Sequence, residues 1–176
     1  MQLASHDLLD FHLPLWEDLP SEPLRVMEMV TYVNDILEPF YKDKKSLLTK
    51  TMVNNYVKWN LIPKPLGRKY ERLHIAHALV ISILKGVLEI SRVHEGIILQ
   101  VKAMGEPDSY NAFCMVFEKV KLQVLLPIAQ GKQSIQFQSS QWKKEEFAMA
   151  TAIATLLFQM VTLDILNQGG IIPCQK

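Results

Sequence analysis

Residues 49–72 read TKTMVNNYVKWNLIPKPLGRKYER, and this stretch decides the fold that the sequence predicts. It begins as a short helix, because the hydroxyl of Thr49 can accept hydrogen bonds from the N–H groups of a first turn. Apolar and aromatic residues then recur at the spacing of a buried helix face: Met52, Val53, Tyr56 and Trp59. The helix must end before Pro63 and Pro65, because proline lacks the N–H donor that a helix interior needs. A second helix follows the loop, so the stretch predicts a DNA-reading head.

The loop between these two helices is basic. Gly67 permits a tight turn, so Arg68 and Lys69 are expected to project from a loop or small hairpin. A helix whose first turn faces bases, beside a loop that grips phosphates, is one way in which proteins read DNA.

The charges of the chain fall into opposed blocks. Residues 1–41 hold eight acidic side chains and one basic one, Arg25, whereas residues 42–92 hold eleven basic and three acidic ones. The two blocks therefore carry −7 and +8, although the whole chain carries only +1. A local excess of Lys and Arg attracts polyanions. The alternative is a solvated basic face that has no ligand.

Length and composition predict a soluble globular protein. The chain has 176 residues, of which 49% are hydrophobic and 21% charged, so it is long enough to bury a core. Its two cysteines, Cys114 and Cys174, lack the spacing of a disulfide framework or a zinc module. Asp7 and Asp10 fall where a secretory signal needs apolar residues. We therefore expect a cytoplasmic protein without an export signal.

Three parts are expected along the chain: an extended N-terminal arm at 1–23, a helix-turn-helix domain at 24–103 and a helical region at 104–176. Prolines interrupt the arm, and apolar periodicity predicts the helices. We expect Ser91 to cap one helix, and Gly169 and Gly170 to end the last one. Residues 130–139 form a polar link in which Ile135 and Phe137 add a short extended piece. The other helices are expected at 24–40, from 49 to about 59, at 73–88, at about 108–128 and at about 142–167.

Residues 147–163 contain no charge and need a separate interpretation. Seventeen residues reach only the short end of a membrane-spanning length. The segment also contains Gln159 and three threonines, and charged residues border it on both sides. A buried or dimer-interface helix is expected, with no membrane contact.

The sequence predicts no enzyme, no catalytic residue and no cofactor. It has no glycine-rich phosphate loop and no Ser or Cys nucleophile with a base at recognisable spacing. His74 and His77 lie three residues apart on a helix, but we expect them at a helix surface without a carboxylate partner, and no metal site is predicted. Cys114 is expected as a buried thiol.

The basic stretch resembles two known groups of proteins. Tyr56, the run Asn60-Leu61-Ile62-Pro63 and the run Arg68-Lys69-Tyr70 resemble the recognition-helix exit and wing of MerR-type regulators. The span from Leu48 to Ile98 more specifically resembles the bacterial family catalogued as domain of unknown function 1836, through the run from Leu48 to Lys58. These resemblances imply a MerR-like winged helix-turn-helix head. Residues 108–167 lack the sustained heptads of a coiled coil and predict two apolar helices instead, so we expect an all-α fold with that head and a C-terminal α-helical hairpin.

The sequence differs from the MerR-type pattern at two positions. Asn54 stands where those proteins usually have arginine, and Asn60 stands where they have glycine. Asparagine can pair with adenine or adopt the left-handed conformation, so both changes are compatible with DNA binding.

We expect two sets of side chains to contact double-stranded DNA. The base-facing set is Lys50, Thr51, Asn54 and Asn55. The phosphate-facing set is Lys58, Lys64, Arg68, Lys69, Tyr70 and Arg72. Core packing is an equal alternative for Tyr56 and Tyr70, because a tyrosine ring often buries while its hydroxyl reaches outward.

The sequence thus predicts a DNA-binding transcriptional regulator whose C-terminal helices serve dimerisation or the sensing of a small-molecule effector. Two alternatives stay open: a helical protein-interaction module, and a small-molecule sensor that does not bind DNA. The salt dependence of binding distinguishes DNA binding from these alternatives. Neutralising about six DNA phosphates predicts a slope near −5 when the logarithm of affinity is plotted against the logarithm of salt concentration.

Overall fold

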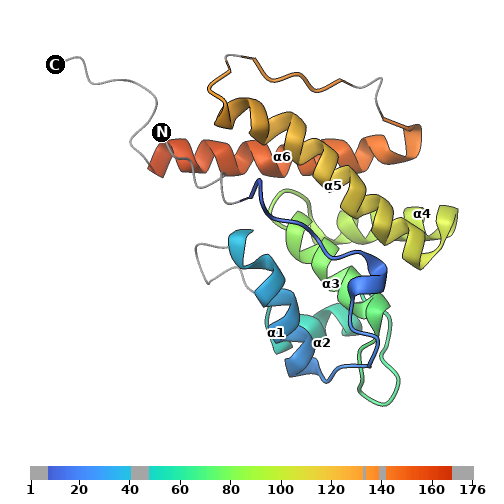
Figure 1. The fold of residues 1–176 in the computed structure, drawn as a ribbon. Coiled ribbons are helices and arrows are strands. Elements are labelled where there is room, and N and C mark those ends of the chain that lie inside the picture. The colour runs from blue at the N-terminus through green and yellow to red at the C-terminus, as the bar shows by residue number, and fades with distance from the viewer. Residues whose placement is uncertain (1–7, 41–47, 133, 139–141, 168–176) are drawn as a thin grey trace. The chain divides into compact units, whose positions relative to one another are not determined.

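A computed structural model describes residues 8–40, 48–132, 134–138 and 142–167. Within these residues the secondary structure is helical, with two isolated β-bridges and no strand, which confirms the predicted all-α class (Figure 1). The chain divides into two compact units, one formed by His12–Met115 and the other by Met1–Phe11 with Val116–Lys176. The helix end predicted at Gly169 and Gly170 lies outside the described residues.

The unit His12–Met115 contains the basic stretch. Helix α1 packs against α2 and α3, and α3 packs against α4. A short 3-10 turn, η3, extends α1, and another, η2, lies in the N-terminal segment. The elements of this unit are η2 (Trp16–Asp18), α1 (Val26–Leu37), η3 (Glu38–Phe40), α2 (Lys50–Lys58), α3 (Arg72–Leu84), α4 (Ile90–Met104) and the first part of α5 (Glu106–Ala129).

Helix α3 is the central helix of this unit. Every residue from His74 to Leu84 is buried, because the sequence of α3 is apolar on all sides and other elements cover it. A helix that is apolar all round belongs in a core. The surrounding helices are amphipathic and turn one face inward; α1, for example, buries Met29, Val33 and Leu37.

The N-terminal segment packs on the start of α5 without forming a regular element beyond η2. The backbone N–H of Trp16 donates to Oδ1 of Asn111 at 2.8 Å. The Sγ of Cys114 lies 3.7 Å from the carbonyl oxygen of Pro14, and Cys114 is buried as predicted. The prolines in this segment prevent a continuous helix, so its backbone groups find partners on neighbouring elements.

A hairpin loop, residues 63–70, joins α2 to α3. Leu66 and Lys69 form an antiparallel bridge around Gly67 and Arg68, whose φ angles are 56° and 62°. Positive φ at both central residues is the signature of a type I′ turn, which matches the twist of the flanking extended segments. The predicted small hairpin is therefore present.

A second bridge ties this hairpin loop to the segment before α1. The N–H of Leu24 donates to the carbonyl of Tyr70 at 2.9 Å, and the N–H of Tyr70 donates to the carbonyl of Leu24 at 2.8 Å. The two residues form an antiparallel pair although 46 positions separate them. The start of α1 is thus held beside the end of the hairpin loop.

The other unit contains the second part of α5 and α6 (Lys144–Asn167). The side chain of Lys121 is fully buried; its Nζ donates to the carbonyl of Phe11 and pairs with Oε2 of Glu118 at 2.8 Å. The ring of Phe11 packs edge-on against that of Phe117, with centroids 6.0 Å apart. Buried charges need partners, so these contacts anchor the N-terminal segment on α5.

Several sequence expectations were wrong in detail. Trp59 was expected in the core but is 57% exposed, because α2 ends at Lys58 and the chain turns there. Glu89 precedes the first turn of α4, and Ser91 lies inside the helix rather than at its cap. The short extended piece expected around Ile135 and Phe137 stays a prediction, since residues 134–138 carry no helix or strand; Phe137 stacks on Trp142 with centroids 5.9 Å apart.

Among the described residues, α6 is the one helix long and apolar enough to cross a membrane by length and composition. The core helix of a soluble protein passes the same test.

Candidate nucleic-acid interface

Helix α2 begins at a site fixed by side-chain hydrogen bonds. The amide of Asn34, on α1, exchanges two hydrogen bonds of 2.9 Å with the backbone of Leu48. Thr49 then accepts a hydrogen bond from the N–H of Met52, which confirms its predicted role as the N-cap. These bonds fix where α2 starts on the body of the unit, and so fix which residues form its first turn.

The two faces of α2 differ in burial. Val53 and Tyr56 pack inward, with 0% and 2% of their surface exposed. The four predicted base-facing residues lie on the other side: Lys50, Thr51 and Asn54 are exposed, and Asn55 is half-buried. Three of the four can therefore meet a ligand directly, whereas Asn55 lies at the edge of the exposed face.

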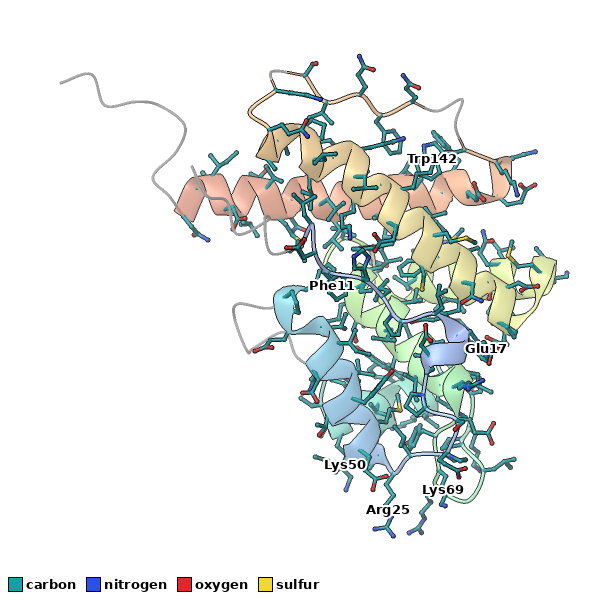
Figure 2. All side chains as sticks on the ribbon, in the orientation of Figure 1. Phe11, Glu17, Arg25, Lys50, Lys69 and Trp142 are labelled. Atoms are coloured by element: carbon teal, nitrogen blue, oxygen red, sulfur yellow. The ribbon has the colours of Figure 1, made fainter. Side chains whose placement is uncertain are left out.

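Five lysines and arginines of α2 and the hairpin loop are exposed. Within the described part of the chain, none of them forms an ion pair: Lys50, Lys58, Lys64, Arg68 and Lys69. Figure 2 shows Lys50 and Lys69 at the same end of this unit, together with Arg25. An excess of exposed positive charge on neighbouring elements attracts polyanions.

Arg68 has a strained backbone. Its φ of 62° lies in the left-handed region, which costs a residue with a Cβ about 1–2 kcal/mol and which Gly or Asn adopts more readily. Asn60, at the exit of α2, has φ 56° and is a residue type suited to it, as the sequence indicated. Strain that a protein retains at an exposed arginine points to a use for that side chain.

Two predicted phosphate-facing residues have other roles in the fold. Tyr70 is 5% exposed, and its ring packs edge-on against His74 with centroids 5.5 Å apart. Arg72 is held by the N-terminal segment: Nη1 donates to Oε2 of Glu17 at 2.8 Å, and Nε donates to the carbonyl of Leu19 at 3.1 Å. We therefore leave Tyr70 and Arg72 out of the proposed interface.

His74 and His77 are buried, so the expectation of a helix surface was wrong. The N–H of Glu71 donates to Nδ1 of His74 at 2.9 Å, and burial lowers the pKa of His74. A neutral His74 ring thus accepts the hydrogen bond of a backbone N–H at the start of α3, directly after the hairpin loop. Nε2 of His77 lies 3.1 Å from Oε2 of Glu106, a carboxylate partner that the sequence did not indicate. The described residues contain no group of three or more potential metal ligands.

Comparison with known protein families identifies the family of this chain. A family model described as a domain of unknown function, DUF1836, matches residues 14–120. The chain belongs to the DUF1836 family. Searches of curated proteins and of solved structures find no match.

The DUF1836 region includes the exposed cations of α2 and the hairpin loop, and it ends before α6. It contains α1 to α4 entirely, the hairpin loop, and α5 as far as residue 120. The sequence had indicated the DUF1836 resemblance at 48–98, so the family match is wider on both sides. It also takes in residues 14–25, of which Leu24 pairs with Tyr70 at the end of the hairpin loop.

Sequence reasoning did not include Arg25 in the interface, because Arg25 stands alone in an acidic block. The Leu24–Tyr70 bridge brings Arg25 to the end of the unit where Lys50 and Lys69 lie (Figure 2). No local pattern signals this pairing, since it joins residues far apart in the chain.

Proposed function

We propose that this protein is a DNA-binding transcriptional regulator that reads double-stranded DNA with α2 and grips its backbone with the hairpin loop. The carrying observation is the set of exposed cations on α2 and the hairpin loop that have no ion-pair partner among the described residues; two of them, Lys50 and Lys69, lie at the same end of the unit (Figure 2). A polyanion supplies the partners that these cations lack. The left-handed Arg68 supports the same assignment, because its side chain stands at the turn of the loop.

The order of elements supports a MerR-like winged helix-turn-helix. In this interpretation α1 and α2 form the helix-turn-helix, α2 is the recognition helix, and the hairpin loop is the wing. Lys50, Thr51 and Asn54 face bases from the first turns of α2, where a recognition helix makes its base contacts. Lys58, Lys64, Arg68 and Lys69 face phosphates. Asn55 has a lesser role at the edge of the face.

The decisive experiment is fluorescence anisotropy with a duplex from upstream of the protein's own gene. We expect binding with a log–log salt slope of about −3.5 or steeper, because each neutralised phosphate contributes about −0.9 and four phosphate-facing cations are proposed. Lys50→Ala should weaken binding about tenfold, since a good base contact is worth about 1–3 kcal/mol.

Lys102→Ala is the matched control, because Lys102 is an exposed lysine on α4 outside the proposed interface. It should bind as the parent does. Absence of binding at about 50 mM salt, where phosphate contacts are strongest, contradicts the proposal. Binding with a slope near zero also contradicts it, and favours a protein-interaction module.

We further propose that α6 joins two copies of the chain. Its exposed side has no charge from residue 147 to residue 163 and includes Phe147, Phe158 and Leu163, each at least 40% exposed. The hydroxyls of Thr151, Thr155 and Thr162 donate to carbonyls of the same helix at 2.8–3.0 Å. Such a face presents no like charges to a copy of itself.

The length of α6 suits this interface. A helix of 24 residues is about 36 Å long, and a stable interface buries about 1,200–2,000 Å² in total. Two such helices, with side chains of their neighbours, approach the lower end of that range. Small residues at 148 and 152 on the same side allow the two backbones to approach closely.

Thr155→Glu tests the α6 interface. Thr155 is exposed in the middle of the charge-free side, so a glutamate there brings two like charges together across a twofold axis. Sedimentation equilibrium should show dimers for the parent and at least about tenfold weaker association for the variant. Thr31→Glu, an exposed threonine on α1, is the control and should leave the dimer intact. A parent that is monomeric at every concentration contradicts the proposal.

A further inference from the structure

The backbone pairing of Leu24 with Tyr70 sets Arg25 opposite Lys69. Leu24 and Tyr70 exchange both of their backbone hydrogen bonds, at 2.9 and 2.8 Å. In an antiparallel pair, the residue after one partner stands opposite the residue before the other. Here these are Arg25, which follows Leu24, and Lys69, which precedes Tyr70. Arg25 is extended, with φ −74° and ψ 159°, so the register continues through it.

This register places two cations on one face. Opposed residues at such a position have Cβ atoms about 4.5–5.5 Å apart, and like charges there destabilise the pair. Both side chains are exposed, and Figure 2 shows them projecting at the same end of the unit. Neither forms an ion pair within the described residues.

Glu28, three residues after Arg25, has a backbone partner. Oε2 of Glu28 accepts the backbone N–H of Arg25 at 2.7 Å, so it satisfies the start of α1. Among the described residues, no ion pair joins this carboxylate to the guanidinium of Arg25. The Arg25–Lys69 pair is left with two positive charges, and an anion between them turns their repulsion into attraction.

We infer that Arg25 is a further phosphate-contacting residue, which binds the DNA backbone together with Lys69. This inference rests on the proposed DNA-binding function and deepens it. The segment before α1 then acts as a third element of the interface, beside α2 and the hairpin loop. A guanidinium suits this role, since it donates to phosphate oxygens through two parallel N–H bonds.

Arg25→Ala tests the inference in the full chain with the same DNA duplex. Affinity should fall about tenfold at about 100 mM salt, and the salt slope should become shallower by about 0.9, from about −4.5 to about −3.5. Arg25→Lys should keep the slope, because it keeps the charge. Arg92→Ala, an exposed arginine of α4 paired with Glu95, should change neither quantity.

The thermal unfolding midpoint of Arg25→Ala without DNA should equal or exceed that of the parent, because the repulsion with Lys69 is gone. A salt slope unchanged by Arg25→Ala, while Lys50→Ala still weakens binding, overturns the role of Arg25 and leaves the proposed function intact. A parent that does not bind DNA at about 50 mM salt overturns the proposed function, and the inference with it.

Discussion

An Arg68→Gly/Lys69→Ala double variant should bind DNA about 100-fold more weakly than the parent at about 100 mM salt. The variant removes two of the four phosphate-facing cations, so its salt slope should also become shallower by about 2. Its stability should not fall. Glycine relieves the left-handed strain at position 68, which is worth about 1 kcal/mol and offsets the greater entropy of the unfolded chain.

Anisotropy titrations at several salt concentrations measure the affinity and its slope, and urea denaturation measures the free energy of unfolding. Lys143→Ala/Lys144→Ala is the matched control, because it removes the same charge from exposed residues at the start of α6. An equal loss of affinity in this control means that net charge alone governs binding. A double variant that binds as tightly as the parent contradicts the role of the hairpin loop.

Tyr70→Ala should lower the free energy of unfolding by about 3–4 kcal/mol, the usual cost of truncating a large buried aromatic residue. The ring is 5% exposed and packs against His74, and its backbone holds the hairpin loop to Leu24. Loss of the ring should loosen this loop, so DNA affinity should fall along with stability. Chemical denaturation checks the first effect.

Tyr70→Phe separates packing from phosphate contact, because it keeps the ring and removes only the hydroxyl. We expect stability within about 1 kcal/mol of the parent and an unchanged DNA affinity. A large loss of affinity in Tyr70→Phe, with stability retained, restores Tyr70 to the phosphate-facing set.

The helices were predictable where local signals agree. Thr49 is an N-cap residue followed by polar residues and an inward stripe, and the prolines at 63 and 65 stop the chain, so α2 lies where the sequence places it. Ser91 has the chemistry of a cap but lies within α4, because capping preference alone does not choose among neighbouring polar residues. Trp59 has the spacing of a core residue, but the helix ends before it turns inward.

The candidate interface was predictable in part for the same reason. The exposure of Lys50, Thr51 and Asn54 follows from the face of α2 that Val53 and Tyr56 do not occupy. The fates of three other residues depend on partners from elsewhere in the chain. Arg72 binds Glu17, Tyr70 packs on His74, and the pairing of Leu24 with Tyr70 brings Arg25 beside the hairpin loop.

By itself, the sequence determined the all-α class, the place of the basic stretch and the family resemblance. These depend on helical periodicity, proline and glycine positions and the order of charges, all of which are local. Only the tertiary structure decided which basic side chains form ion pairs and hydrogen bonds within the described residues and which do not. That choice depends on long-range contacts, because the acidic N-terminal segment brings Arg25 to the end of the unit where Lys50 and Lys69 lie, and pairs Arg72 with Glu17.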